Sequence, residues 1–128
     1  MKTERRLLGD FGEKIAARFL RRRRYRILEK NFVSGHHEID LIAENAEFLV
    51  FVEVKTRTYS EAYIERYGSA ASAVDFKKQK SLVSAALDYL RNSKNKKRIR
   101  FDVIEIYVSK DDPSVICDIH HMLDAFRP

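Results

Sequence analysis

The segment Glu38–Arg57 most constrains the fold, because two apolar runs stand there on either side of a short polar stretch. This pattern is typical of a β-hairpin. Three charged residues, Asp40, Glu53 and Lys55, interrupt the apolar runs. An unpaired charge is costly in a protein interior, so we expect these side chains to be paired, to bind a metal ion or to take part in chemistry.

The alternation of side chains along a strand predicts that these three charged groups share one face. Residues two apart point the same way, which puts Glu53 and Lys55 together. A turn centred on Asn45-Ala46 places Asp40 diagonal to Glu53, and a turn centred on Ala46-Glu47 places it directly opposite. The Cβ atoms of the two acids are then about 7–8 Å or about 5 Å apart.

Two carboxylates this close repel each other unless a cation lies between them. Oxygen ligands suit a hard divalent ion such as Mg²⁺ or Mn²⁺, which can polarise a phosphodiester and lower the pKa of a bound water. The ammonium of Lys55 can orient that water, act as its base or stabilise transition-state charge. The alternative is a cross-strand salt bridge between Lys55 and either acid.

In one sequence pattern, Asp40 is followed by twelve intervening residues and then by Glu53-Val54-Lys55. This pattern resembles the PD-(D/E)xK signature of restriction-endonuclease-like nucleases. The wider pattern is similar to the YraN-like family of small bacterial proteins, predicted nucleases related to archaeal Holliday-junction resolvases. The matching segments are residues 12–16, 38–43, 50–57, 73–79 and 100–103. Two positions depart from the pattern: His37 stands where the family usually has Gly, and Ile39 replaces the proline of the signature.

The alternation of expected helices and strands predicts an α/β protein. The resemblance implies a single domain over residues 1–128 with a restriction-endonuclease-like core, αβββαβ, whose mixed central sheet is flanked by helices. It also implies that Asp40 and Glu53 bind the metal ion and that Lys55 is catalytic. Lys78 and Gln79 match the family pattern, and with Arg57 they are expected to contact nucleic acid.

Glu13 belongs to a first helix that helical apolar spacing predicts over residues 3–23. It lies off the apolar stripe, and most neighbours three and four positions away are small, which lets a helix approach a sheet closely. The alternative is a solvated helix glutamate, but with the resemblance we expect Glu13 to be a further metal ligand and catalytic residue.

The rest of the chain is expected to form a strand at a sheet edge, a second helix, two further strands and a short covering helix. A long polar loop precedes the second helix; its tyrosines can stack on bases, and the alternative is a merely disordered loop. The expected ranges are 25–32 for the edge strand, 58–72 for the loop, 73–90 for the helix with Ser72 or Asp75 as its cap, 99–108 and 115–120 for the strands, and 121–126 for the covering helix.

The charge balance points to a polyanionic partner. Lys and Arg total 25 against 19 Asp and Glu, a net charge of +6. Arg22, Arg23 and Arg24 stand in the densest basic run, which is either a solvated face or a clamp on a nucleic-acid backbone. We expect DNA rather than RNA, recognised through backbone or shape.

Several protein classes are not expected. The single Cys117 rules out an internal disulfide and fits a reducing cytoplasm, and the N-terminal residues carry no apolar signal segment. The longest apolar run is too short to cross a membrane, and there is no Gly-rich phosphate loop. We therefore expect a cytoplasmic protein that does not bind membranes.

Two functions are compatible with this pattern. The first is a Mg²⁺- or Mn²⁺-dependent endonuclease, which the intact set of two acids and a lysine favours. The alternative is a catalytically weak or inactive nucleic-acid-binding module on a nuclease fold. A chain of 128 residues has little surface left to grip a duplex beside such a site, which favours a partner or a homodimer.

Overall fold

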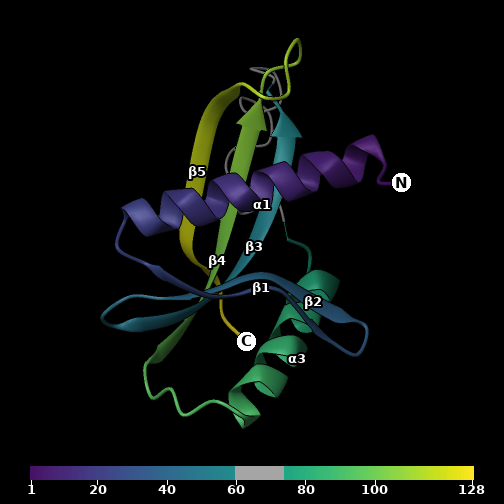
Figure 1. Cartoon of the computed structure of the whole chain (residues 1–128). Coiled ribbons are helices and arrows are strands. Elements are labelled where there is room, and N and C mark those ends of the chain that lie inside the picture. The colour runs from purple at the N-terminus through teal and green to yellow at the C-terminus, as the bar shows by residue number, and fades with distance from the viewer. Residues whose placement is uncertain (60–73) are drawn as a thin grey trace.

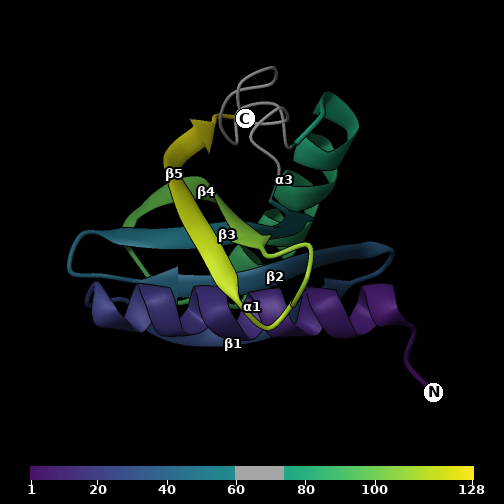
Figure 2. The same cartoon turned by 90° about the horizontal axis from the view of Figure 1, so that it is seen from above.

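A computed structural model describes residues 1–59 and 74–128 and shows a five-stranded sheet between two helices. Helix α1 covers one face of the sheet and α3 the other, as Figure 1 and Figure 2 show. The elements in chain order are α1 (Glu4–Arg22), β1 (Arg26–Ser34), β2 (His37–Glu44), β3 (Phe48–Thr58), α3 (Phe76–Arg91), β4 (Arg98–Val108) and β5 (Ile116–Phe126).

The sheet is mixed, with strand order β1-β2-β3-β4-β5. β3 and β4 are parallel and the other neighbouring pairs are antiparallel. A parallel pair needs a crossover connection, and α3 lies in the connection between β3 and β4. The expected α/β class, the mixed sheet and the order αβββαβ are confirmed, with β1 at an edge and β5 added after the expected core.

Helix α1 packs unusually close to the sheet because its contact face is made of small residues. Ala16 and Ala17 are fully buried, and a Cβ atom built on Gly12 would lie 1.8 Å from Thr56 Oγ1. Thr3 caps the start of the helix, where its Oγ1 accepts a hydrogen bond from the Arg6 backbone N–H at 3.1 Å. The close approach expected from the small residues around Glu13 is therefore present.

Helix α3 begins as expected at an aspartate cap. Asp75 Oδ1 accepts a hydrogen bond from the Lys78 N–H at 2.8 Å, and Leu82, Ala85 and Ala86 bury the inner face of the helix. The expected loop begins after Arg57, but Thr58 is the last residue of β3. The rest of that loop after Tyr59 and the alternative cap, Ser72, lie outside the described residues.

The β2–β3 turn decides the register of the hairpin. Asn45 Oδ1 accepts hydrogen bonds from the N–H groups of Glu47 and Phe48 at 2.9 and 2.7 Å, a turn that asparagine favours. Leu41 then lies opposite Val52. This pairing corresponds to a turn centred on Ala46-Glu47, the second of the two expected registers.

The expected covering helix at residues 121–126 is wrong. These residues continue strand β5, in which Met122 pairs with Val103 and Phe126 with Phe101 of β4. A six-residue helix has little stability of its own, whereas pairing satisfies the backbone groups of β4 that would otherwise form an open edge. The packing of Phe126 on Phe101, with ring centroids 5.0 Å apart, adds apolar contact to the strand.

Candidate active site

The candidate site lies at a fork between β2 and β3. The two strands pair from Glu44 and Leu49 up to Leu41 and Val52, whereas β3 pairs with β4 as far as Thr58. Figure 1 shows β3 continuing beside β4 away from the β1–β2 hairpin. The next residues after the last paired positions are Asp40 and Glu53, so the two acids stand where the strands separate.

Asp40 takes over the backbone pairing at this fork. Its Oδ2 accepts a hydrogen bond from the Val54 N–H at 2.8 Å. Burial, followed by the hydrogen bond to the Glu53 carboxyl and the charge of that group, raises the pKa of Asp40 to about 8, against the opposing effects of the Val54 N–H and Lys78. A carboxyl with such a pKa holds its proton near neutrality because burial disfavours its charged form and a second acid lies against it.

Glu53 is buried, with 3% of its surface exposed. The ammonium of Lys78 lies 3.4 Å from its Oε2 and that of Lys55 lies 3.9 Å away. Within residues 1–59 and 74–128, Oε2 has no hydrogen-bond partner. Lys55 thus forms a long ion pair with Glu53 along β3, rather than the cross-strand salt bridge considered as the alternative, and a buried oxygen of Glu53 is left without a hydrogen bond.

Glu13 of helix α1 extends the acidic group. Helix α1 holds it half-buried near Asp40 and Glu38. Burial, then the charges of Asp40, Glu38 and Asp10, raise the pKa of Glu13 to about 7, against the opposing charge of Arg6. In the part of the chain that the structure describes, no three His, Cys, Asp or Glu side chains converge closely enough to form a ready metal cage.

Three of the expected nucleic-acid contacts have partners inside the protein. Lys78 lies against Glu53, and Gln79 Nε2 donates to the Val74 carbonyl at 3.1 Å. Arg57 Nε donates to the buried Glu105 Oε2 at 2.8 Å. The position of Lys78 at the start of a helix, which opposes the helix dipole, is therefore explained by Glu53 without an external polyanion.

Arg22, Arg23 and Arg24 lie at the far end of α1 from the acids. All three are exposed, and the guanidinium of Arg23 stacks over the Phe19 ring at 4.3 Å from its centroid. Arg22 stands nine positions after Glu13 in the helix, a rise of about 13 Å. The structure therefore does not bring this basic run together with the carboxylates.

Two residues of the site were missed by the sequence reasoning. Asn31 of β1 and Glu38 of β2 adjoin Glu13. Asn31 has a φ of 51°, in the left-handed region that asparagine tolerates better than most residues. An asparagine inside an expected strand, where asparagine is uncommon, was the signal that could have found it.

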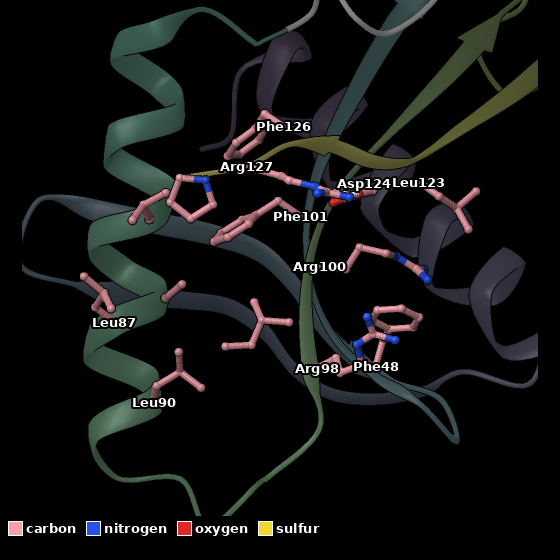
Figure 3. A pocket seen from close by; sticks show the side chains of 14 residues that line it. Phe48, Leu87, Leu90, Arg98, Arg100, Phe101, Leu123, Asp124, Phe126 and Arg127 are labelled. Atoms are coloured by element: carbon pink, nitrogen blue, oxygen red, sulfur yellow. Dashed lines mark hydrogen bonds and ion pairs between the residues drawn. The ribbon is translucent and has the colours of Figure 1, made fainter.

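A cavity of about 620 Å³ lies elsewhere, between α3, β4 and the C-terminal part of β5 (Figure 3). Most of its lining is apolar, including Leu87, Leu90 and Phe101. None of the clustered carboxylates lines it, so it is separate from the candidate site. Of the clustered acids, Glu13 lines a second hollow, of about 360 Å³, together with Arg5 and Arg6.

No helix among the described residues has the length and apolarity needed to cross a membrane. Comparison with known structures finds a likeness to SfsA of Pyrococcus furiosus in complex with Ca²⁺, with 17% identity and a TM-score of 0.35. The alignment covers 94% of this chain and 64% of that chain.

Sequence comparison finds close relatives over nearly the whole chain. A UPF0102 protein of Caldanaerobacter subterraneus is 42% identical over 98% of both chains. Another, from Clostridioides difficile, is 39% identical over 92% of this chain and 95% of its own, and one from Rhodococcus jostii is 41% identical over 93% and 95%. Residues 12–106 match the family model. The chain therefore belongs to the uncharacterised protein family UPF0102.

Proposed function

We propose that this protein is a metal-dependent nuclease that hydrolyses phosphodiester bonds in DNA. The observation that carries the proposal is the pair of acids, Asp40 and Glu53, that meet at the β2–β3 fork with two lysines beside them. Burying two carboxylates against each other is unfavourable unless function requires it. The family match assigns no activity, because the family is uncharacterised. It supports a nuclease only in that the matched residues include the acids and the lysine of the nuclease-like motif.

A divalent cation fits the residues present. The Asp40 carboxyl has a raised pKa because it is buried and because Glu53 lies against it, and the buried Oε2 of Glu53 lacks a hydrogen bond from any described residue. A cation between the two acids would replace their repulsion by attraction and give that oxygen a partner. The all-oxygen donor set suits Mg²⁺ or Mn²⁺, with Asp40 and Glu53 as ligands. Glu13 does not converge closely with these two acids among the described residues, so it would become a further ligand through a bound water or after its side chain moves towards them.

The bound ion would supply charge for the scissile phosphate and a more acidic water. Asp40 must lose its proton before it can act as a ligand, and the Val54 N–H stabilises the ionised form. Lys55, which is partly exposed beside Glu53, would orient the attacking water or stabilise the charge of the transition state. Lys78 holds the Glu53 carboxylate from the α3 side.

The surrounding cations suit a nucleic-acid backbone. Arg5 and Arg6 line the hollow beside Glu13, and the exposed run Arg22–Arg24 lies farther along the same helix. Contacts of this kind neutralise phosphates without reading bases. We therefore propose recognition of DNA through its backbone or shape.

The alternative function is a nucleic-acid-binding module without useful activity. The observation that favours it is the contact between Lys78 and Glu53, because an ammonium 3.4 Å from the carboxylate neutralises part of the charge that would attract a metal ion. In this alternative the two lysines replace the cation permanently.

Mn²⁺ binding tests the choice between the two functions. Calorimetry should show Mn²⁺ binding to the wild type and its loss in Asp40→Asn and Glu53→Gln, while the exposed-acid control Asp111→Asn binds normally. The same four proteins are assayed for cleavage of branched, duplex and single-stranded DNA, which should follow metal binding. A folded wild type that shifts DNA but binds no Mn²⁺ would establish the binding module instead.

A further inference from the structure

Asn31 lies between two carboxylates of the candidate site. The β1–β2 pairing sets Lys30 opposite Leu41 and Phe32 opposite Ile39, which places Asn31 opposite Asp40. With its amide nitrogen facing the acids, Asn31 Nδ2 lies 2.6 Å from Glu13 Oε1 and 3.1 Å from Glu38 Oε1. A carboxamide has two N–H donors, so this one side chain can donate to both acids.

The backbone at Asn31 departs from regular strand geometry. Its φ of 51° is strained for most residues, though glycine and asparagine adopt it more easily. At the same level, Ile39 packs into the α3-side core and Leu41 into the α1-side core, although residues two apart in a regular strand share a face. The twist at this position therefore lets a β1 side chain reach α1 and β2 together.

A neutral donor is well suited to this place. Glu13, Glu38 and Asp40 repel one another, and without a partner the more exposed side chains would turn towards water. A lysine or arginine here would compete with a metal ion for the same oxygens. The asparagine offsets the repulsion between Glu13 and Glu38 without adding a positive charge.

We propose that Asn31 is a positioning residue that holds the Glu13 carboxylate beside Asp40 and thereby sets the affinity of the site for a divalent cation. The proposal rests on the proposed function. Asn31 itself touches neither the cation nor the substrate; it acts through Glu13. Hydrogen-bond partners of ligands commonly change metal affinity by about 10- to 100-fold when removed.

The substitution Asn31→Gly tests this role, because glycine accepts the left-handed backbone and removes only the carboxamide. Calorimetry should show Mn²⁺ affinity reduced about 10-fold or more, within the range expected when a hydrogen-bond partner of a ligand is removed. The matched control is Asp124→Gly, since Asp124 also has a positive φ, 53°, but belongs to β5 at the other edge of the sheet. Its Mn²⁺ affinity should equal that of the wild type.

A second measurement on the metal-free protein separates this proposal from the proposed function. Side-chain couplings in the NMR spectrum should show one χ1 rotamer for Glu13 in the wild type and in Asp124→Gly, and averaged rotamers in Asn31→Gly. Unchanged Mn²⁺ affinity in Asn31→Gly, or equal Glu13 rotamers in all three proteins, would overturn the positioning role. A wild type that binds no Mn²⁺ overturns the proposed function, and the Glu13 rotamers then show whether Asn31 positions that side chain.

Discussion

The carboxylate of Asp40 accepts a hydrogen bond from the backbone N–H of Val54 at 2.8 Å, across the point where β2 and β3 separate. This hydrogen bond replaces the strand pairing that ends at Leu41 and Val52. It holds the Asp40 side chain beside Glu53, the residue that precedes Val54. The backbone where β2 and β3 separate therefore positions the acidic pair. The repulsion between the two acids lowers the free energy of unfolding, which can be measured.

That cost predicts a pH dependence of stability in metal-free protein. Burial and the Glu53 carboxyl raise the pKa of Asp40 from 3.8 to about 8, so the folded state keeps a proton that the unfolded chain has released. The free energy of unfolding should then fall as pH rises from about 4 to 8, by on the order of 1 kcal/mol per pH unit. Chemical denaturation across this range measures the slope, and Asp40→Asn should reduce it to the part that Glu13, whose pKa is raised to about 7, contributes; an equal slope in both proteins would contradict the raised pKa of Asp40.

In the presence of Mn²⁺, the free energy of unfolding should fall less with rising pH than it does in the metal-free protein. Binding requires the ionised carboxylate, so each ion displaces a proton from Asp40 below its pKa of about 8. Apparent affinity should rise by up to about tenfold per pH unit between pH 6 and 7.5 for one displaced proton. Calorimetry in two buffers of different ionisation enthalpy counts the released protons; no proton release at pH 6.5 would exclude Asp40 as the titrating ligand.

Removing Lys78 should destabilise the metal-free protein. Lys78→Met leaves the buried Glu53 carboxylate with only the more distant ammonium of Lys55, and we expect the free energy of unfolding to fall by about 1 kcal/mol because Lys78 is partly solvated. Added Mn²⁺ should reduce the difference in the free energy of unfolding between Lys78→Met and the wild type, because the ion supplies the missing positive charge. Lys77→Met, one residue earlier and exposed, is the control and should unfold like the wild type.

Replacing Gly12 by alanine should push helix α1 away from the sheet and lower the stability of the protein. A Cβ on Gly12 would lie 1.8 Å from Thr56 Oγ1 and 3.1 Å from Thr56 Cβ, a stiff β-branched side chain, so Gly12→Ala should cost about 1–3 kcal/mol. Gly9→Ala on the same helix has nothing within 4 Å of its new Cβ and should be neutral or stabilise by up to about 1 kcal/mol. Thermal unfolding compares the two, and adding Thr56→Ala to Gly12→Ala should restore part of the stability.

The basic run at the end of α1 should affect binding rather than chemistry. Replacing Arg22, Arg23 and Arg24 by Ala should weaken DNA binding and reduce the slope of log affinity against log salt by roughly one for each phosphate that is no longer neutralised. Because even Arg22, the first of the three, lies about 13 Å along the helix from Glu13, turnover at saturating DNA should not change. Fluorescence anisotropy over a range of salt concentrations measures the slope; an unchanged slope means that the run is a solvated face.

Much of the fold could be predicted from local patterns in the sequence. The apolar spacing of α1, the hairpin and the Asp75 cap each depend on residues near in the chain, and each was found as expected. The strand at residues 121–126 was not expected, because its pairing partner is β4, which is distant in the sequence. In so short a segment, pairing with a neighbouring strand outweighs the local helix or strand propensity.

The amino-acid sequence by itself determined which acids could meet, since side-chain alternation puts Glu53 and Lys55 on one face and the hairpin brings Asp40 to Glu53. Only the tertiary structure decided that Lys78 and Asn31 belong to the same group, and that Arg22–Arg24 do not. The physical reason is distance along the chain. Strand alternation and turn geometry act between near neighbours, whereas contacts of α1, β1 and α3 with the fork depend on how whole elements pack.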